Sequence, residues 1–208
     1  MLEDIIGGCD PVWSEKYPDP MAKNYWDMAS HRIFYVNSDI DDTILELQKH
    51  IIEINYQDFG IEPENRKPIV IVLNTPGGYL QETFSMCDTI ISSKTPVWTV
   101  NVGSAMSGGF LLLLAGHKRF TVKHAMAMVH SGGGGVSGTF EQQEAAQANY
   151  RKQVSQMRAY ILARTTIDEK TLKRNQAKDW YMDADEQVKY GVVDKVIEDL
   201  DEIVGAII

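Results

Sequence analysis

Five consecutive apolar residues, Ile69-Val70-Ile71-Val72-Leu73, constrain this chain most. A strand that is apolar on both faces is typical of a parallel sheet buried between layers. Strand-like segments also stand before it, at 32–36, and after it, at 96–100, and helical patterns separate the three. Alternation of strands and helices requires right-handed crossover connections. The chain is therefore predicted to be an α/β protein with a largely parallel sheet.

Further elements follow along the chain. Additional strands are predicted at 118–122, 125–129 and 192–197, and a polar loop at 58–68. Residues 139–165 form one long predicted helix whose first half, 141–151, is polar almost all round. A polar helix of this length either projects or meets a partner subunit, or it is a plain solvated helix, and the pattern leaves both open.

The chain reads as one domain. Residues 1–29 are expected to be an irregular N-terminal arm whose aromatic residues pack against something, and residues 30–200 a single domain. Residues 201–208 are a short apolar tail that packs on a neighbour or frays. With 208 residues and no internal repeat, the sequence gives no sign of a second core.

Composition excludes several classes of function. The formal net charge is −9 and no basic stripe is present, which argues against a nucleic-acid partner. No run approaches the ~18 apolar residues of a membrane span, and the acidic start is no signal peptide. Cys9 and Cys87 make no disulfide framework, so a reducing, cytoplasmic location is expected. Neither a metal-ligand spacing nor a nucleotide-binding glycine pattern occurs, and no cofactor is expected.

Ser107 is the first candidate for chemistry. It lies in Gly103-Ser104-Ala105-Met106-Ser107-Gly108-Gly109, directly before the apolar helical run 110–116. Free backbone N–H groups and the helix dipole at such a position stabilise an anion. Gly108 allows a substrate to approach its N–H without a side chain in the way. A serine here is also a common helix cap, and Ser104 is a rival with the same two interpretations.

Two other segments complete a possible site. Gly78, in Asn74-Thr75-Pro76-Gly77-Gly78, follows the neighbouring strand and can supply a second oxyanion donor, since open α/β sheets form sites at carboxyl ends of strands. His130 is the histidine that ends a buried strand and precedes a run of glycines. The remaining histidines are interpreted as surface residues: His31, His50, His117 and His124.

The residue that orients the histidine stays open on spacing alone. A nucleophilic serine needs a base in hydrogen-bond reach and a third group that orients the base. The pool of aspartates after the long helix is wide: Asp168, Asp179, Asp183, Asp185 and Asp194.

Taken in order, these motifs resemble the proteolytic subunit of the Clp protease, the ClpP family, over roughly residues 30–200. Residues 74–78 resemble the family's Asn-Ser-Pro-Gly-Gly, and Gly103 to Gly116 resembles the segment with the nucleophilic serine. Met128-Val129-His130 is similar to the family's Met-Ile-His. The segment 178–184, Lys-Asp-Trp-Tyr-Met-Asp-Ala, resembles the block that carries the aspartate, and residues 190–194 resemble its closing Tyr-Gly-Leu-Val-Asp.

This resemblance implies a site and an architecture. It makes Ser107 the nucleophile, His130 the base and Asp179 the third member, with Gly78 and Gly108 as the oxyanion hole. It implies a ClpP/crotonase-like spiral of ββα units with a projecting handle helix at about 139–165. The implied assembly is a homo-oligomer of two stacked heptameric rings. An AAA+ unfoldase would feed unfolded polypeptides into its closed chamber.

The sequence departs from the family pattern in three places. Val70 and Val72 stand where the family often has Tyr-x-Tyr, whose aromatics help to form the unfoldase docking pocket. Gly132 replaces a proline after the histidine, and residues 1–29 do not resemble the usual gating loop. A divergent or phage-type member fits these differences. The alternatives are a crotonase-type acyl-CoA enzyme, which shares the spiral and a two-amide oxyanion hole, and an inactive subunit that scaffolds a ring.

Overall fold

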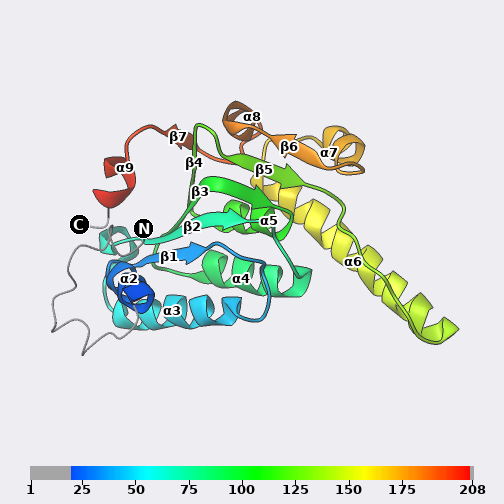
Figure 1. Ribbon diagram of the computed structural model, residues 1–208, viewed down its shortest axis with the longest axis horizontal. Coiled ribbons are helices and arrows are strands. Elements are labelled where there is room, and N and C mark those ends of the chain that lie inside the picture. Colours follow the sequence, from blue (N-terminus) through cyan, green and yellow to red (C-terminus); the bar gives the residue numbers. More distant parts are fainter. Residues whose placement is uncertain (1–19, 207–208) are drawn as a thin grey trace.

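The computed structural model describes residues 20–206, which form an α/β structure around a mostly parallel sheet (Figure 1). In this part of the chain the sheet has seven strands, with β1-β2-β3-β4-β7 as its main path. All pairs are parallel except β5 with β6. The strands are β1 (Ile33–Val36), β2 (Ile69–Thr75), β3 (Val97–Met106), β4 (Lys118–Val122), β5 (Met126–Val129), β6 (Trp180–Met182) and β7 (Lys195–Ile197). The predicted α/β fold is confirmed.

The long strand β3 connects the scaffold to the site. Its first half pairs with β4, from Trp98↔Lys118 to Asn101↔Thr121. Its second half pairs with β5 instead, from Ser104↔Met126 to Met106↔Met128. The strand β2 lies along its other side and stays in register up to Leu73↔Asn101, where the register shifts. The carboxyl ends of β2, β3 and β5 therefore meet at one edge of the sheet.

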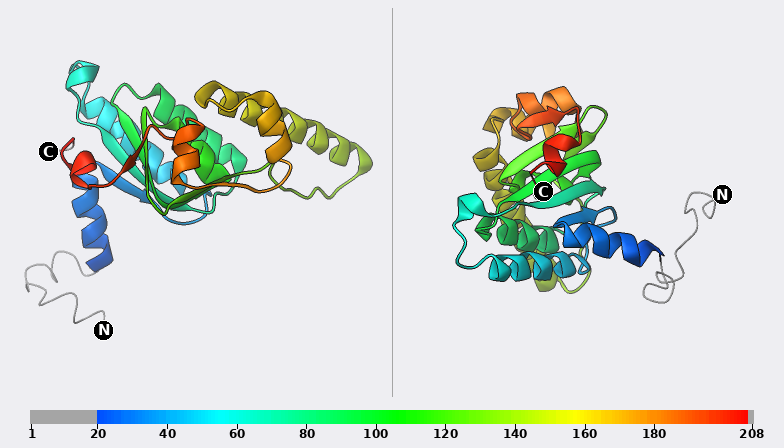
Figure 2. Two further views of the ribbon diagram at one scale, coloured as in Figure 1. Left: turned by 90° about the horizontal axis from the view of Figure 1, so that it is seen from above. Right: turned by 90° about the vertical axis from the view of Figure 1, so that its left-hand side faces the viewer.

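Helices cover the sheet unequally. Figures 1 and 2 show α3 and α4 lying side by side under the sheet and α6 extending well beyond the body of the molecule. The helix α6 begins at a capping box formed by Thr139 and Gln142, and its buried residues, Met157 and Ile161, lie in its second half. The projecting helix is thus confirmed. The helices are α2 (Pro20–Ser30), α3 (Ile44–Gln57), α4 (Leu80–Ser92), α5 (Gly108–Ala115), α6 (Phe140–Arg164), α7 (Glu169–Asn175), α8 (Ala184–Lys189) and α9 (Asp201–Val204), with a 3-10 turn at Pro63–Asn65.

The two faces of β2 enter two separate apolar clusters. Ile69, Ile71 and Leu73 belong to the main core together with every residue of α5 except its two glycines. Val70 and Val72 face the other way, into a smaller cluster with Val100, Ile197 and Ile203. Burial on both faces is what the uninterrupted apolar run predicts.

One expectation about the chain ends needs correction, that of the N-terminal arm. Residues 20–30, expected to be irregular, form α2; residues 1–19 and 207–208 lie outside the described part. The hydroxyl of Tyr25 in α2 lies 2.9 Å from Nε2 of His50, whose ring stacks on Phe34. Packing of this kind stabilises a helix that intrinsic propensity leaves marginal. At the other end, α9 buries Ile203 against the sheet.

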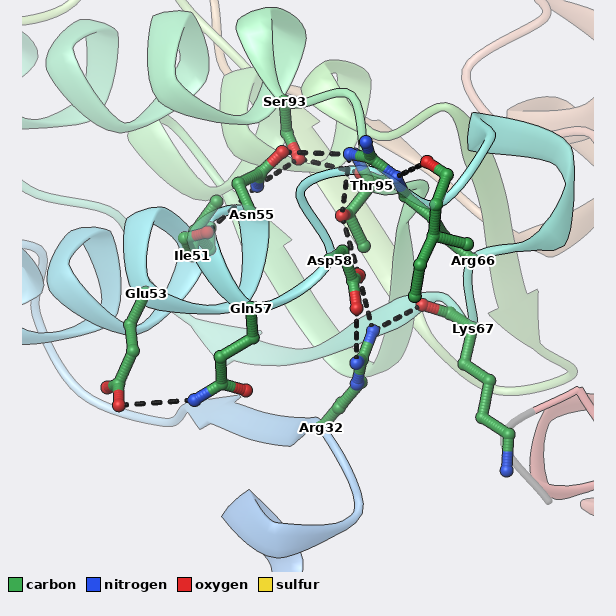
Figure 3. Close-up of polar contacts among 11 residues, drawn as sticks. Arg32, Ile51, Glu53, Asn55, Gln57, Asp58, Arg66, Lys67, Ser93 and Thr95 are labelled. Carbon is green, nitrogen blue, oxygen red and sulfur yellow. Dashed lines mark hydrogen bonds and ion pairs between the residues drawn. The ribbon is translucent and has the colours of Figure 1, made fainter.

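The buried carboxylate of Asp58 joins three segments that lie far apart in the sequence (Figure 3). Asp58, at the end of α3, is 3% exposed. Both oxygens accept hydrogen bonds from the guanidinium of Arg32, at 2.7 and 2.8 Å, and one also accepts from the Thr95 hydroxyl at 2.8 Å. The hydrogen bonds from Arg32 hold the pKa of this carboxyl below its usual range. Arg32 itself has φ +62°, an uncommon backbone conformation for a residue with a side chain.

The thiol of Cys87 lies in the main core, between α4 and α5, with its sulfur 3.5 Å from the Leu111 carbonyl oxygen. Burial raises the pKa of Cys87 to about 12, so the reactive thiolate is scarce at neutral pH. We expect iodoacetamide to leave Cys87 unmodified in the native protein at about pH 8 and to alkylate it once urea unfolds the chain. Peptide-resolved mass spectrometry separates this residue from Cys9. Rapid native alkylation of Cys87 would contradict the described packing.

Candidate active site

Ser107 stands between the end of β3 and the first residue of α5. Its backbone has φ +53° and ψ −114°, and its N–H donates to the Met128 carbonyl oxygen at 2.8 Å. Although it occupies the N-cap position, its side chain makes no capping hydrogen bond. An uncommon conformation held by the surrounding structure is frequent at functional sites. The cap interpretation of Ser107 is therefore wrong, and the hydroxyl is available for another role.

His130 immediately follows β5, which pairs with the final residues of β3. This pairing carries Nε2 of His130 to 2.8 Å from Oγ of Ser107. A neutral imidazole at that distance can accept the serine proton. The two residues, 23 positions apart in sequence, thus lie in the hydrogen-bond contact that a nucleophile and its base need.

Asp179 is the aspartate that the fold brings to His130. It directly precedes β6, and the antiparallel pairing Val129↔Trp180 sets it beside the end of β5. Its Oδ1 lies 3.4 Å from Nδ1 of His130. Contacts of this kind are often long without substrate and shorten in the complex.

The other aspartates in the pool have structural roles. Asp168 and Asp183 are N-caps of α7 and α8, where they accept hydrogen bonds from Thr171 and Glu186 N–H groups. Asp194 accepts from the N–H of Arg119 and lies 3.5 Å from its guanidinium. Asp185 lies in the first turn of α8, where a negative charge suits the helix dipole. Of these residues, only Asp179 lies within contact distance of His130.

Gly78 and Gly108, the two expected oxyanion donors, are neighbours in the fold. A side-chain carbon built on Gly108 would lie 3.3 Å from the nitrogen of Gly78, which places these glycines side by side. Among residues 20–206, neither N–H has a hydrogen-bond acceptor. The Gly78 segment is held by two backbone hydrogen bonds of Ile40, each 2.8 Å, and a side-chain carbon on Gly78 would stand 2.1 Å from the Ile40 oxygen. Glycine at 78 is therefore a steric requirement.

Ser104, the rival nucleophile, is engaged elsewhere. Its N–H and its hydroxyl both donate to Oδ1 of Asn74 at 3.1 Å. His117 is exposed, as expected of a surface residue, and its Nδ1 accepts a hydrogen bond from the N–H of Val97 at 2.9 Å. Burial of part of the ring lowers the pKa of His117, which favours the neutral ring that this bond needs.

A groove of about 1130 Å³ opens at Ser107 and His130. Pro76, Gly77 and Gly78 line one side, and the glycine run 132–135 lines another. The first half of α6 supplies the outer wall with Phe140, Glu144, Gln147 and Tyr150. The sequence did not reveal this wall, because a helix that is polar all round carries no sign of which side faces a substrate.

Within residues 20–206, no helix is long and apolar enough to cross a membrane. The same part of the chain holds no group of three metal-ligating side chains.

An α/β scaffold that brings a serine, a histidine and an aspartate into contact is typical of the class of serine hydrolases. The family model of the Clp protease matches residues 19–200. The ATP-dependent Clp protease proteolytic subunit 2 of Bacillus licheniformis is 31% identical over 173 residues, which cover 82% of this chain and 88% of that protein. The chain belongs to the Clp protease family and is a proteolytic subunit, a serine-type endopeptidase. The family expected from the motifs is confirmed.

Proposed function

We propose that Ser107, His130 and Asp179 form the catalytic triad of this endopeptidase, with the N–H groups of Gly78 and Gly108 as its oxyanion hole. The observation that carries the proposal is the 2.8 Å contact between Oγ of Ser107 and Nε2 of His130 at the mouth of the groove. The adjacency of the two glycines, whose N–H groups have no acceptor among residues 20–206, supports it.

The reaction follows from this geometry. Oγ of Ser107 attacks the peptide carbonyl carbon while Nε2 of His130 takes its proton, and the oxyanion accepts hydrogen bonds from Gly78 and Gly108. His130 then gives the proton to the leaving amine. Water attacks the acyl-enzyme by the same route in the second half. Asp179 holds the proton on Nδ1, so that Nε2 is free to act as a base.

The groove suits an extended peptide. Two glycine stretches, 77–78 and 132–135, flank Ser107 and leave main-chain groups accessible to a substrate strand. Such recognition depends little on sequence and requires an unfolded chain. We therefore propose unfolded polypeptides as substrates, with broad preference.

Membership of the family implies an oligomer that works with a Clp ATPase. We propose two stacked heptameric rings around a closed chamber, with α6 between the rings and an AAA+ unfoldase at the entrance. The projection of α6 beyond the rest of the subunit supports this arrangement (Figure 1). We also propose a cytoplasmic location, which suits a free cysteine such as Cys87.

A fluorophosphonate probe tests the nucleophile. We expect it to label Ser107, because attack of Oγ on phosphorus with loss of fluoride uses the same base and the same oxyanion donors. Tryptic mapping identifies the modified residue, and His130→Ala should lose the labelling. Binding of a CoA thioester without labelling would favour the crotonase-type alternative. Assembly without labelling or peptide cleavage would favour the inactive scaffold.

A further inference from the structure

The main chain beside His130 is anchored at the next residue, Ser131. Its N–H and its hydroxyl both donate to the carbonyl oxygen of Gln176, at 2.9 and 3.0 Å. Beyond it begins the run Gly132-Gly133-Gly134-Gly135, and at 133–135 an added side-chain carbon would meet nothing within 4 Å. Glycines without contacts have wide conformational freedom. Ser131 is therefore the hydrogen-bonded residue that separates His130 from the flexible glycine segment of the groove.

The helix α6 contacts Ser131 directly. The hydroxyl of Tyr150 donates to the carbonyl oxygen of Ser131 at 2.9 Å. Gly132 follows with φ +81°, and a side-chain carbon there would stand 3.3 Å from the same hydroxyl. The close approach of the tyrosine therefore depends on the glycine. Tyr150 is 36% exposed, so this hydrogen bond forms at the edge of the groove rather than in the core.

The same helix also reaches Ser131 through Gln176. Gln176 is 1% exposed, and with its amide oxygen turned toward α6 it accepts from the guanidinium of Arg158 at 2.6 Å. Ser131 is thus held through its carbonyl by Tyr150 and through its N–H and hydroxyl by a residue that Arg158 orients. Residues two turns apart on one helix thus hold the two peptide units that flank Ser131.

We infer that Tyr150 is a positioning residue, which sets the imidazole of His130 against Ser107 by holding the carbonyl oxygen of Ser131. The inference rests on the proposed role of His130 as the base. Proton transfer depends steeply on donor–acceptor geometry, and a small misplacement of a catalytic group costs an order of magnitude or more in rate. The Tyr150 hydroxyl thereby helps to fix the distance between His130 and Ser107 without contacting the reacting atoms.

Tyr150→Phe tests the inference because it removes one oxygen and keeps the ring in the groove. We expect kcat for a short fluorogenic peptide to fall roughly tenfold with KM nearly unchanged. The rate constant for fluorophosphonate inactivation should fall by a similar factor, since that reaction needs His130 but not the extended groove. Tyr56→Phe removes a hydroxyl from the exposed side of α3 and serves as the control, with wild-type values expected.

The outcomes separate this inference from the proposed function. If His130→Ala is inactive but Tyr150→Phe keeps the wild-type kcat and inactivation rate, the positioning role is refuted and the triad stands. A rise in KM alone would make Tyr150 a substrate contact and would equally overturn the inference. If His130→Ala keeps full activity, the proposed function itself fails. The mass of the assembly, measured for each variant, shows whether an altered rate reflects altered association.

Discussion

Ser107→Ala is expected to lower the peptidase rate at least about 10⁴-fold, to the level left by binding and oxyanion contacts alone. The variant lacks Oγ, the proposed nucleophile, and the hydroxyl of Ser104 does not replace it, because it is bound to Asn74. Hydrolysis of a fluorogenic peptide and of an unfolded protein measures the effect.

The same variant should keep its fold and its assembly. The described hydrogen bond of the Ser107 hydroxyl is the one with His130, and its side chain does not cap α5. Alanine carries the same Cβ at φ +53°, so the backbone strain is unchanged. Melting temperature and particle mass should therefore match those of the wild type within error. Loss of assembly in this variant would make Ser107 a structural residue.

Asp58→Asn is expected to lower the free energy of unfolding strongly. The amide cannot match both donors of Arg32 and the hydroxyl of Thr95, so a partly buried guanidinium loses its partner. Breaking a buried pair on one side costs on the order of 3 kcal/mol. Urea unfolding at one fixed protein concentration measures this, because association contributes to the apparent stability of an oligomer.

The matched control is Glu46→Gln on the same helix. Glu46 pairs with Lys49 at 2.6 Å, but the two side chains are 68% and 71% exposed. Exposed pairs of this kind contribute at most about 1 kcal/mol. An equal decrease in the free energy of unfolding for Asp58→Asn and Glu46→Gln would show that the contacts of Asp58 in Figure 3 contribute no more than an exposed ion pair.

The stabilisation by Asp58 depends on pH in a defined direction. Its pKa is lower in the folded than in the unfolded chain, mainly because Arg32 donates to the carboxylate. The stabilisation is therefore fully present above the unfolded pKa of about 3.9 and is lost as pH falls through the folded value. The difference in stability between wild type and Asp58→Asn should be constant near neutral pH and shrink below about pH 4.

The strongest predictions from sequence concerned segments with one dominant pattern. The uninterrupted apolar run of β2 predicts burial on both faces, and Val70 and Val72 do enter a second cluster. The helix α5, apolar all round, is buried at every position. In such segments hydrophobic burial outweighs all other contributions, so pattern alone determines the structure.

Residue spacing alone was not enough to predict the members of the candidate site. Glycine and turn chemistry placed Ser107 and Gly78 at strand ends, and the glycines after His130 singled out that histidine. The third residue could not be chosen from the residues alone, because Asp179 is brought to His130 by β6, a three-residue strand too short to show alternation. The family resemblance supplied it, and its catalytic role remains a prediction.

Two features were missed for a shared reason. The segment 58–68 looked like a polar loop, yet Asp58 is buried by partners 26 and 37 positions away, Arg32 and Thr95. The helix α2 contains aromatic residues without a clear period, and it packs beside His50 of α3. Contacts between distant segments decide both, and no local pattern encodes them.

Every residue of α5 is buried, and the carbonyls of Leu114 and Ala115 at its end accept hydrogen bonds from Arg164. The helix that begins directly after Ser107 therefore opens only when the core opens. Its amide hydrogens should then exchange with deuterium as slowly as any in the molecule. Opening of the core would therefore displace Ser107 and abolish activity. A subunit that begins to unfold would lose its peptidase activity before its own chain became a substrate.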